Sequence, residues 1–298
     1  MNSFIRFCLY FGRNPVPSDQ NTLKCYVAFL ARSLNPNSIP GYLNIIRIMH
    51  VSAGFPNPLQ NNWEVNMVKK GVSRKLGRPP RQKLPITVHI LLGILKNLDL
   101  SSNFDLAFWC ACLICFYGLF RKNTLLPSCA SDKSSAFLIR GDVSKLTLSS
   151  FHILVRQTKT IQFGQRVLSI PFVACVDARL CPVSALIRHL AGSPLARDFP
   201  LFSYKIGDRI LCLSHTVFVK RLKVILGTLG FPASEYSGHS FRRGGCTFCF
   251  RAGLSLTEIK LRGDWKTQAF ERYLHVPAST VFHGAYVMSE FVAVILSK

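Results

Sequence analysis

One short stretch of the sequence, GHSFRRGG at residues 238–245, gathers an imidazole and two guanidinium groups between glycines. Residues three apart lie on the same face of a helix, so His239 and Arg242 can converge on one ligand. Cationic donors on one face favour an anion. If that anion is a phosphodiester, its transfer to a new oxygen gathers negative charge, which a guanidinium can stabilise without giving up a proton.

The other groups that such a transfer needs lie elsewhere in the chain. Arg121 follows a long apolar segment that would hold it rigidly, and it is a candidate for a second charge clamp. The leaving oxygen needs an acid and the attacking oxygen needs a base or a directed hydrogen bond, which Lys159 and His239 can supply. Acids are few and form no compact pair near the basic cluster, so the sequence predicts chemistry without a metal ion. Metal-free transfer requires a side-chain nucleophile, and Tyr273, eight residues after Trp265, is the candidate.

The overall charge points to a polyanionic partner. The chain of 298 residues has 37 Lys and Arg against 14 Asp and Glu, a formal net charge of +23. Nucleic acid, with double-stranded DNA as the form expected below, is the favoured partner, and an anionic membrane surface is the second candidate. The uncharged segment at residues 106–120 is shorter than the ~20 residues that cross a bilayer, so it predicts a buried core helix and no membrane anchor.

Eleven cysteines raise the question of disulfides or a metal site. The chain is long and apolar enough to fold without disulfides, and no signal peptide precedes it, so a reducing intracellular location is expected. Two C-x-x-C pairs, Cys112 with Cys115 and Cys246 with Cys249, lie in apolar runs that lack the Gly or Pro turn of a zinc knuckle. They are predicted to be buried thiols, and neither a metal nor another cofactor is expected.

Residues 1–76 are predicted to form a domain of short helices. Apolar residues recur at spacings of three and four after Asn21 and after Ser38, with these two residues as N-caps and Gly54 as a stop. Residues 67–83 then carry seven basic residues and no acid, and two prolines make 77–83 a linker. This basic run either follows a phosphate backbone or only keeps a hinge soluble. The predicted DNA-binding residues are Lys69, Lys70, Arg74, Lys75, Arg78, Arg81, Lys83 and Arg243.

Residues 84–298 are predicted to form a second, larger domain. Helices are expected at residues 85–98 and 106–120, after which the period of the apolar residues changes. Runs at 151–159 and 166–172 are rich in β-forming residues and predict a hairpin with Lys159 near its tip. Helices return from Pro182 onward. The fold class is therefore mainly α with a small β-sheet.

Taken together and in this order, the candidate residues resemble the tyrosine recombinases, also called the phage integrase family. HSFRRGG resembles the family's H-x-x-R box, FYGLFRKN its first arginine box, RQTKTIQFG its hairpin lysine, and RGDWKTQAFERYL its His/Trp and tyrosine boxes. The sequences of these boxes are especially similar to those in the recombinases of DIRS-type retrotransposons and Cryptons, where GDW replaces the LGH of bacterial integrases. The catalytic residues that the resemblance implies are Arg121, Lys159, His239, Arg242, Trp265 and Tyr273.

The resemblance implies a two-domain clamp on DNA, with a helical core-binding domain and a mixed α/β catalytic domain. The family's tyrosine attacks DNA, forms a 3′-phosphotyrosine and releases a 5′-hydroxyl, and no nucleotide cofactor is needed. It further implies a homotetramer on DNA, a mobile element as the source and a nuclear location. The alternative is a catalytically silent or co-opted DNA-binding protein that keeps the fold. Usable chemistry at all six positions favours the active enzyme.

Three features bear on how closely this chain follows the family. Asp142 matches an acidic position that supports the family's site, and a simple turn residue is the equal alternative. The acid that often follows the first arginine is absent from RKNTLLP, which alters the support of Arg121. The N-terminal domain is short, which suggests that a first helix has been trimmed.

Overall fold

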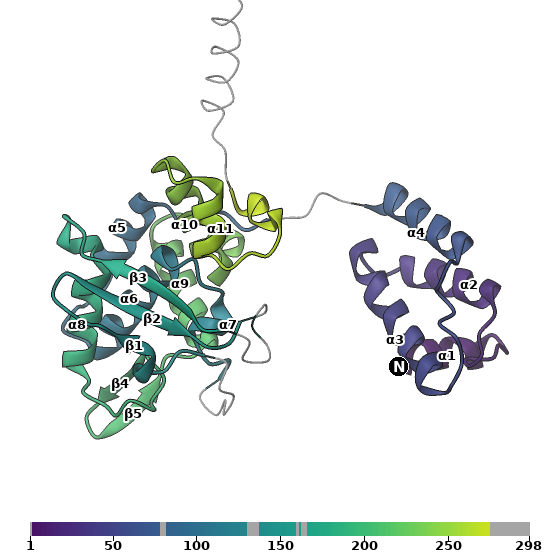
Figure 1. The fold of residues 1–298 in the computed structure, drawn as a ribbon, viewed down its shortest axis with the longest axis horizontal. Coiled ribbons are helices and arrows are strands. Elements are labelled where there is room, and N and C mark those ends of the chain that lie inside the picture. Colours follow the sequence, from purple (N-terminus) through teal and green to yellow (C-terminus); the bar gives the residue numbers. More distant parts are fainter. Residues whose placement is uncertain (1, 78–81, 130–136, 159–160, 162–165, 275–298) are drawn as a thin grey trace, which may run out of the picture. The chain divides into compact units, whose positions relative to one another are not determined.

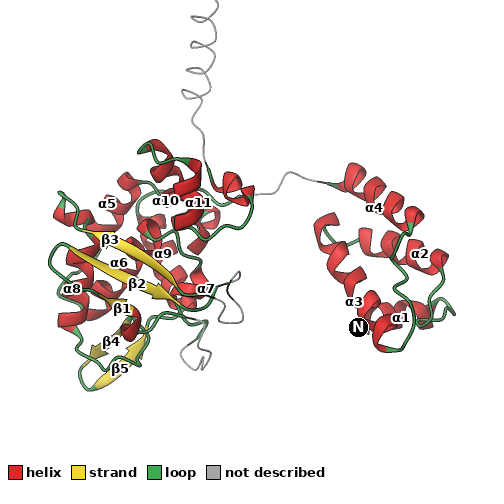
Figure 2. Cartoon of the chain, in the orientation of Figure 1, coloured by secondary structure: helices red, strands yellow, loops and turns green. Residues whose placement is uncertain are grey.

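The computed structural model describes residues 2–77, 82–129, 137–158, 161 and 166–274. The chain divides into two compact units, Met1–Arg81 and Gln82–Lys298, and each is described by itself (Figure 1). The boundary between them falls inside the predicted linker, 77–83. Helices make up most of the first unit and are the main regular element of the second, and the strands all belong to the second unit in the part of the chain described (Figure 2).

The first unit is a small helical bundle. Its helices are α1 (Asn2–Tyr10), α2 (Gln20–Ala31), α3 (Ile39–Ser52) and α4 (Trp63–Leu76). Leu23, Val27 and Ile46 lie in its buried core. The predicted helices are confirmed, but the N-cap assigned to Asn21 is wrong. Asp19 caps α2 instead, because its carboxylate accepts both the backbone N–H and the hydroxyl of Thr22, at 2.6 and 2.8 Å.

The second unit is built around one helix that is buried on all sides. Its α-helices are α5 (Val88–Lys96), α6 (Asn103–Tyr117), α7 (Lys122–Leu125), α8 (Pro182–Gly192), α9 (His215–Thr228), α10 (Gly238–Arg251) and α11 (Leu256–Arg262). Every residue from 107 to 116 of α6 is buried, as its uncharged sequence predicts. The helix ends at Tyr117, earlier than predicted, and Leu119 then takes a positive φ of 52°. No helix among the described residues has the length and apolar character needed to cross a membrane.

The predicted hairpin is confirmed, with shorter strands. β2 (Ser150–Val155) pairs with β3 (Leu168–Val173) in antiparallel register, and β1 (Val143–Ser144) adds a third strand beside β2. Phe151 and Phe172 face each other across the pair, with their ring centroids 4.7 Å apart. A second hairpin of β4 (Ser203–Ile206) and β5 (Arg209–Cys212) was not predicted, because three of the four β5 residues are exposed and show no alternation.

The two C-x-x-C pairs are buried thiols, as predicted. Cys112 and Cys115 lie inside α6, and Cys246 and Cys249 lie on α10 in a smaller apolar cluster. Burial raises the pKa of Cys115 to about 12, so this thiol stays protonated at neutral pH. Within the described ranges, no three His, Cys, Asp or Glu side chains gather as potential metal ligands.

Two glycines in the middle of α10 let this helix touch neighbouring main chain. A Cβ on Gly244 would lie 1.8 Å from the carbonyl oxygen of Ile86, and one on Gly245 would lie 2.0 Å from that of Phe116. The backbone N–H of Ile86 also donates to the carbonyl of Ser240, at 2.9 Å. The glycines of RRGG therefore hold α10 against α6 and against the segment that enters α5.

We expect Gly244→Ala to lower the free energy of unfolding by about 1–3 kcal/mol, because the added methyl cannot fit without moving main chain. Gly227→Ala is the matched control, since Gly227 lies in α9 and a Cβ there would meet nothing within 4 Å. The control should leave stability unchanged or raise it by up to about 1 kcal/mol. Urea denaturation of both variants tests this, and equal stabilities would contradict the close contact.

Candidate active site

Arg242 lies at the centre of the predicted catalytic set. It points inward from α10 and is 2 % exposed. One terminal nitrogen donates to the carbonyl of Leu119, and the other donates to that of Gly263 at 2.7 Å. Its guanidinium carbon lies 3.8 Å from the ring centroid of Trp265. One side chain thus connects α10, the loop after α6 and the loop after α11.

The environment of Arg242 leaves its charge intact at neutral pH. Burial, and after it the charge of Arg121, lowers the pKa of Arg242 to about 10. A group with this pKa remains protonated near pH 7. Its Nε is buried and has no hydrogen-bond partner among the described residues. Both terminal nitrogens donate to carbonyls, so Arg242 is a buried cation, and its contact with a phosphate stays a prediction.

Trp265 and Tyr273 pack together beside this cation. Tyr273 ends the 3₁₀ helix Gln268–Tyr273, and its ring centroid lies 5.4 Å from that of Trp265 and 5.4 Å from the guanidinium carbon of Arg242. The hydroxyl of Thr247 on α10 donates to the Tyr273 carbonyl, at 3.5 Å. Gly263 makes room for the Trp265 ring, because a Cβ at that position would lie 1.7 Å from it.

The sequence predicts that Arg121 directly follows the apolar helix. In the structure α6 ends at Tyr117, and Arg121 takes the N-cap position of α7. It is half-buried, and its charge lowers the pKa values of both Arg242 and His239, which places the three groups within electrostatic reach of one another. Arg121 lines a narrow crevice together with residues from the end of the hairpin, from α10 and from the segment 262–264. Its lining includes Arg121, Thr158, Arg242, Arg262, Gly263 and Asp264.

His239 is the second residue of α10 and keeps part of its surface open to solvent. Its pKa is lowered, first by the loss of surrounding water and then by the charges of Lys122, Arg242 and Arg121. The neutral imidazole, which can accept a proton, therefore persists to lower pH than usual.

Two further basic groups gather near His239 that sequence reasoning did not assign. Lys122 lies beside the start of α10, 3.1 Å from where a Cβ of Gly238 would be. The ring of His215, at the start of α9, lies near the same glycine, and burial and the charges of Lys122 and His239 lower its pKa. Lys122 could have been predicted from the sequence, because it directly follows Arg121 after the apolar run. No neighbouring residue indicated that His215 would lie near His239.

Lys159 lies outside the described residues, as do Arg78 and Arg81. The residue before Lys159 reaches the site directly, because the hydroxyl of Thr158 donates to Oδ2 of Asp264 at 2.9 Å. The opposite side of the hairpin is joined to the same carboxylate by an ion pair from Arg166.

Asp142 supports the sheet and is not only a turn residue. Its buried carboxylate accepts the backbone N–H of Ile139 at 2.9 Å and the guanidinium of Arg156 at 3.0 Å. Since Arg156 directly follows β2, Asp142 connects the start of β1 to the end of β2. No contact between Asp142 and Arg121 occurs in the described set of hydrogen bonds and ion pairs.

The predicted DNA-binding residues are divided between the two units. Those at 69–75 belong to α4 in the first unit and are not part of a linker: Lys69, Lys70, Arg74 and Lys75. Lys83 lies in the second unit, where its ammonium group donates to the carbonyl of Ser234 at 2.6 Å. Arg243 is half-buried and donates to the side chain of Gln82.

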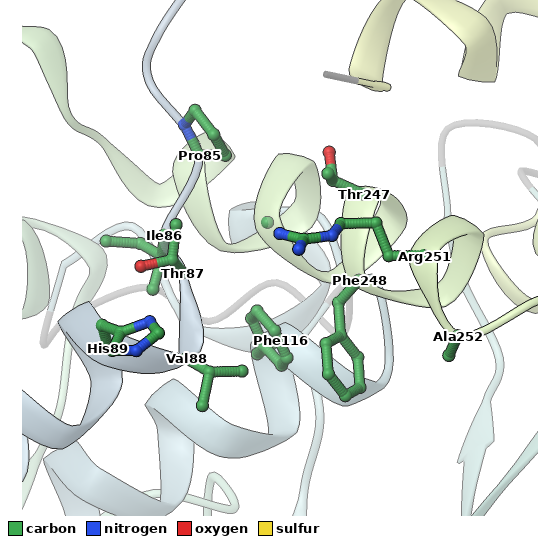
Figure 3. Close-up of a pocket in the computed structure, with 11 residues that line it drawn as sticks. Pro85, Ile86, Thr87, Val88, His89, Phe116, Thr247, Phe248, Arg251 and Ala252 are labelled. Carbon is green, nitrogen blue, oxygen red and sulfur yellow. The ribbon is translucent and has the colours of Figure 1, made fainter. Parts of the chain in front are cut away.

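A separate pocket of about 410 Å³ lies between the start of α5, the end of α6 and α10 (Figure 3). Phe116 and Phe248 form part of its wall, and Arg251 lies beside them (Figure 3). The predicted catalytic residues do not line it, and Thr247 is the side chain that connects it to the Tyr273 main chain. The crevice that Arg121 and Arg242 line is therefore the candidate site.

The sequence is similar to one described recombinase over most of its length. An integrase/recombinase XerD homolog from Selenomonas ruminantium is 26% identical over 258 residues, which cover 83% of this chain and 70% of the relative. No protein-family model matches the chain.

Solved structures share its fold. XerH site-specific recombinase, bound to palindromic difH substrate in a post-cleavage complex, aligns with a TM-score of 0.58 and 14% identity, covering 97% of this chain and 76% of that one. The Tn1549 transposon integrase, in complex with circular intermediate DNA, aligns with a TM-score of 0.55 and 13% identity, covering 91% and 86%. The predicted fold class, mainly helical with small sheets in a two-domain architecture, is confirmed by these neighbours.

Proposed function

We propose that this chain, a tyrosine recombinase by its fold and by its similarity to a XerD homolog, cuts and rejoins DNA strands through Tyr273. The observation that carries the proposal is the packing of Tyr273 and Trp265 around the buried cation of Arg242. In the forward step the phenol oxygen bonds to phosphorus and the bond to the 5′ oxygen breaks. The phenol proton is lost, the 5′ oxygen gains a proton, and a 5′-hydroxyl on another strand reverses the step.

Each cationic group has a distinct part in this proposal. Arg121, the more open of the two arginines, stabilises the charge on the phosphate oxygens. Arg242 stabilises the negative charge that develops during the attack, and its contacts hold the rings of Trp265 and Tyr273 in place. Neutral His239 accepts a hydrogen bond or a proton, and Lys159 gives a proton to the departing 5′ oxygen.

The proposal extends to the assembly and source of the protein. Each tyrosine can hold one cut strand, and exchange between two duplexes cuts four strands, so four subunits are needed on the DNA. The DNA-bound state of the XerH and Tn1549 neighbours supports DNA as the partner. The GDW sequence at residues 263–265 is the basis for proposing an origin in a DIRS-type or Crypton element. A nuclear location is proposed together with that origin.

The covalent intermediate provides the direct test. We would incubate the protein with a library of nicked duplexes that carry a randomised central segment, so that the short fragment diffuses away after cleavage and traps the adduct. The adduct should survive denaturing electrophoresis and should form in excess EDTA, because the proposed chemistry uses no metal ion. DNA binding without any adduct would favour the silent DNA-binding protein, and cleavage that requires magnesium would indicate a nuclease.

Basic residues of α4 are expected to control the salt dependence of DNA binding. Each phosphate that a protein neutralises contributes about −0.9 to the slope of log affinity against log salt. Changing Lys69, Lys70, Arg74 and Lys75 together to Ala should therefore flatten the slope by roughly one for each phosphate that is no longer neutralised. Lys24→Ala is the control, because Lys24 is already paired with Glu64 in the same unit. A slope that is unchanged in the fourfold variant would remove α4 from the DNA interface.

A further inference from the structure

Asp264, in the GDW stretch, has an unusual backbone conformation and a buried carboxylate. Its φ is +53°, in the left-handed region. Glycine adopts this conformation most readily, and Asp and Asn adopt it more readily than most other residues. It is 8 % exposed. Aspartate rather than glycine at this position costs some backbone strain, so the side chain has a use that offsets it.

The carboxylate of Asp264 joins both sides of the β2–β3 hairpin beyond its strands. Oδ2 accepts the hydroxyl of Thr158 at 2.9 Å, and Oδ1 is ion-paired with Arg166. Thr158 is in turn bridged to the buried Ile161 by two backbone hydrogen bonds, of 3.1 and 3.2 Å. One side chain thus holds the end of the hairpin from across about a hundred residues of sequence.

The residues on each side of Asp264 both contact Arg242. The carbonyl of Gly263 accepts a guanidinium N–H of Arg242, and the ring of Trp265 stacks on the same guanidinium. Asp264 is therefore the joint between this cluster around Arg242 and the hairpin. Arg262, at the end of α11, makes a second connection to the hairpin. It donates to the carbonyl of Tyr117 in α6 at 2.7 Å and to that of Pro171 in β3 at 3.2 Å. That connection does not involve the Asp264 carboxylate, so β3 stays attached when the carboxylate is removed.

We infer that Asp264 is a positioning residue for the departing 5′ oxygen: it ties Thr158, the residue before Lys159 in the chain, to the Arg242 cluster. This inference rests on the proposed function and on the role of Lys159 in it. Thr158 directly precedes Lys159 in the sequence, so the anchor acts next to the proposed acid. Misplacement of a catalytic group by about 1 Å can cost about a hundredfold in rate, and a lost anchor acts through this effect.

Asp264→Gly separates positioning from folding. Glycine takes a φ of +53° without strain, so the variant loses the carboxylate and keeps the backbone. We expect covalent cleavage of a normal nicked duplex to slow about ten- to a hundredfold, with DNA affinity unchanged. A duplex with sulfur in place of the bridging 5′ oxygen should restore the rate to within about twofold of wild type, because a thiolate leaves without needing a proton.

Three further proteins make the outcome decisive. Lys159→Ala should show the same slowing and the same rescue by sulfur, and Asp208→Gly, in the exposed β4–β5 turn, should show neither. Equal slowing of Asp264→Gly on both duplexes would show a general structural role and overturn the inference, as would no slowing on either. Wild-type protein that forms no adduct on either duplex would overturn the proposed function, and this inference with it.

Discussion

Tyr273→Phe is expected to abolish the covalent protein–DNA adduct, with a loss of at least about a thousandfold in yield. The substitution removes one oxygen, and no other atom of the residue can bond to phosphorus. A phenol is a weak nucleophile at neutral pH and needs help from nearby positive charge. The lost adduct therefore reports on the attack on phosphorus, which is the step that Arg242 assists. Trapping on the nicked library, followed by peptide mapping, measures both the amount and the position of the adduct.

The structure predicts that the same variant folds and binds DNA normally. The Tyr273 contacts that hold the segment are made by its ring, to Trp265, and by its carbonyl, to Thr247, and Phe keeps both. Tyr286→Phe, which alters the next tyrosine along the chain, is the control and should retain the adduct. DNA attached at Tyr286, or continued cleavage with no tyrosine modified, would show that the nucleophile is wrongly assigned.

Arg242→Ala should lose both the adduct and a large part of the stability. The substitution removes the cation between two aromatic rings and leaves the carbonyls of Leu119 and Gly263 without their donors in a buried place. Loss of a large buried side chain together with its hydrogen bonds typically lowers the free energy of unfolding by about 3–5 kcal/mol. Denaturant unfolding measures this loss, and adduct trapping at low temperature measures the activity of the molecules that remain folded.

Arg242→Lys distinguishes the charge of this residue from its shape. Lysine keeps the charge but cannot stack flat on Trp265 while donating to two carbonyls. We expect a smaller loss of stability than in the alanine variant and a loss of activity that remains about a hundredfold. Arg188→Ala removes one positive charge from the exposed surface of α8 and should change neither quantity. Wild-type stability and adduct yield in Arg242→Ala would contradict the central place that we give this residue.

The sequence by itself determined most of the local elements and the order of the candidate catalytic residues. The 15 residues of α6 contain one charged group, so burial on all sides follows from composition. The β2–β3 hairpin follows from two runs rich in β-forming residues, and the candidate residues follow from their types and spacing. In contrast, β5 was missed because its side chains are mostly exposed, and the N-cap at Asp19 was missed because several polar residues compete near that helix start.

Only the tertiary structure decided how the site residues relate to one another. The sequence predicts that Arg242 faces a phosphate, and only the structure shows that its terminal nitrogens meet the carbonyls of Leu119 and Gly263, which no spacing within α10 reveals. The contact of Asp264 with Thr158 and the approach of His215 to His239 are likewise long-range. Local periodicity reflects the geometry of one helix or strand, whereas these contacts depend on how several elements pack, and that packing is set by the whole core at once.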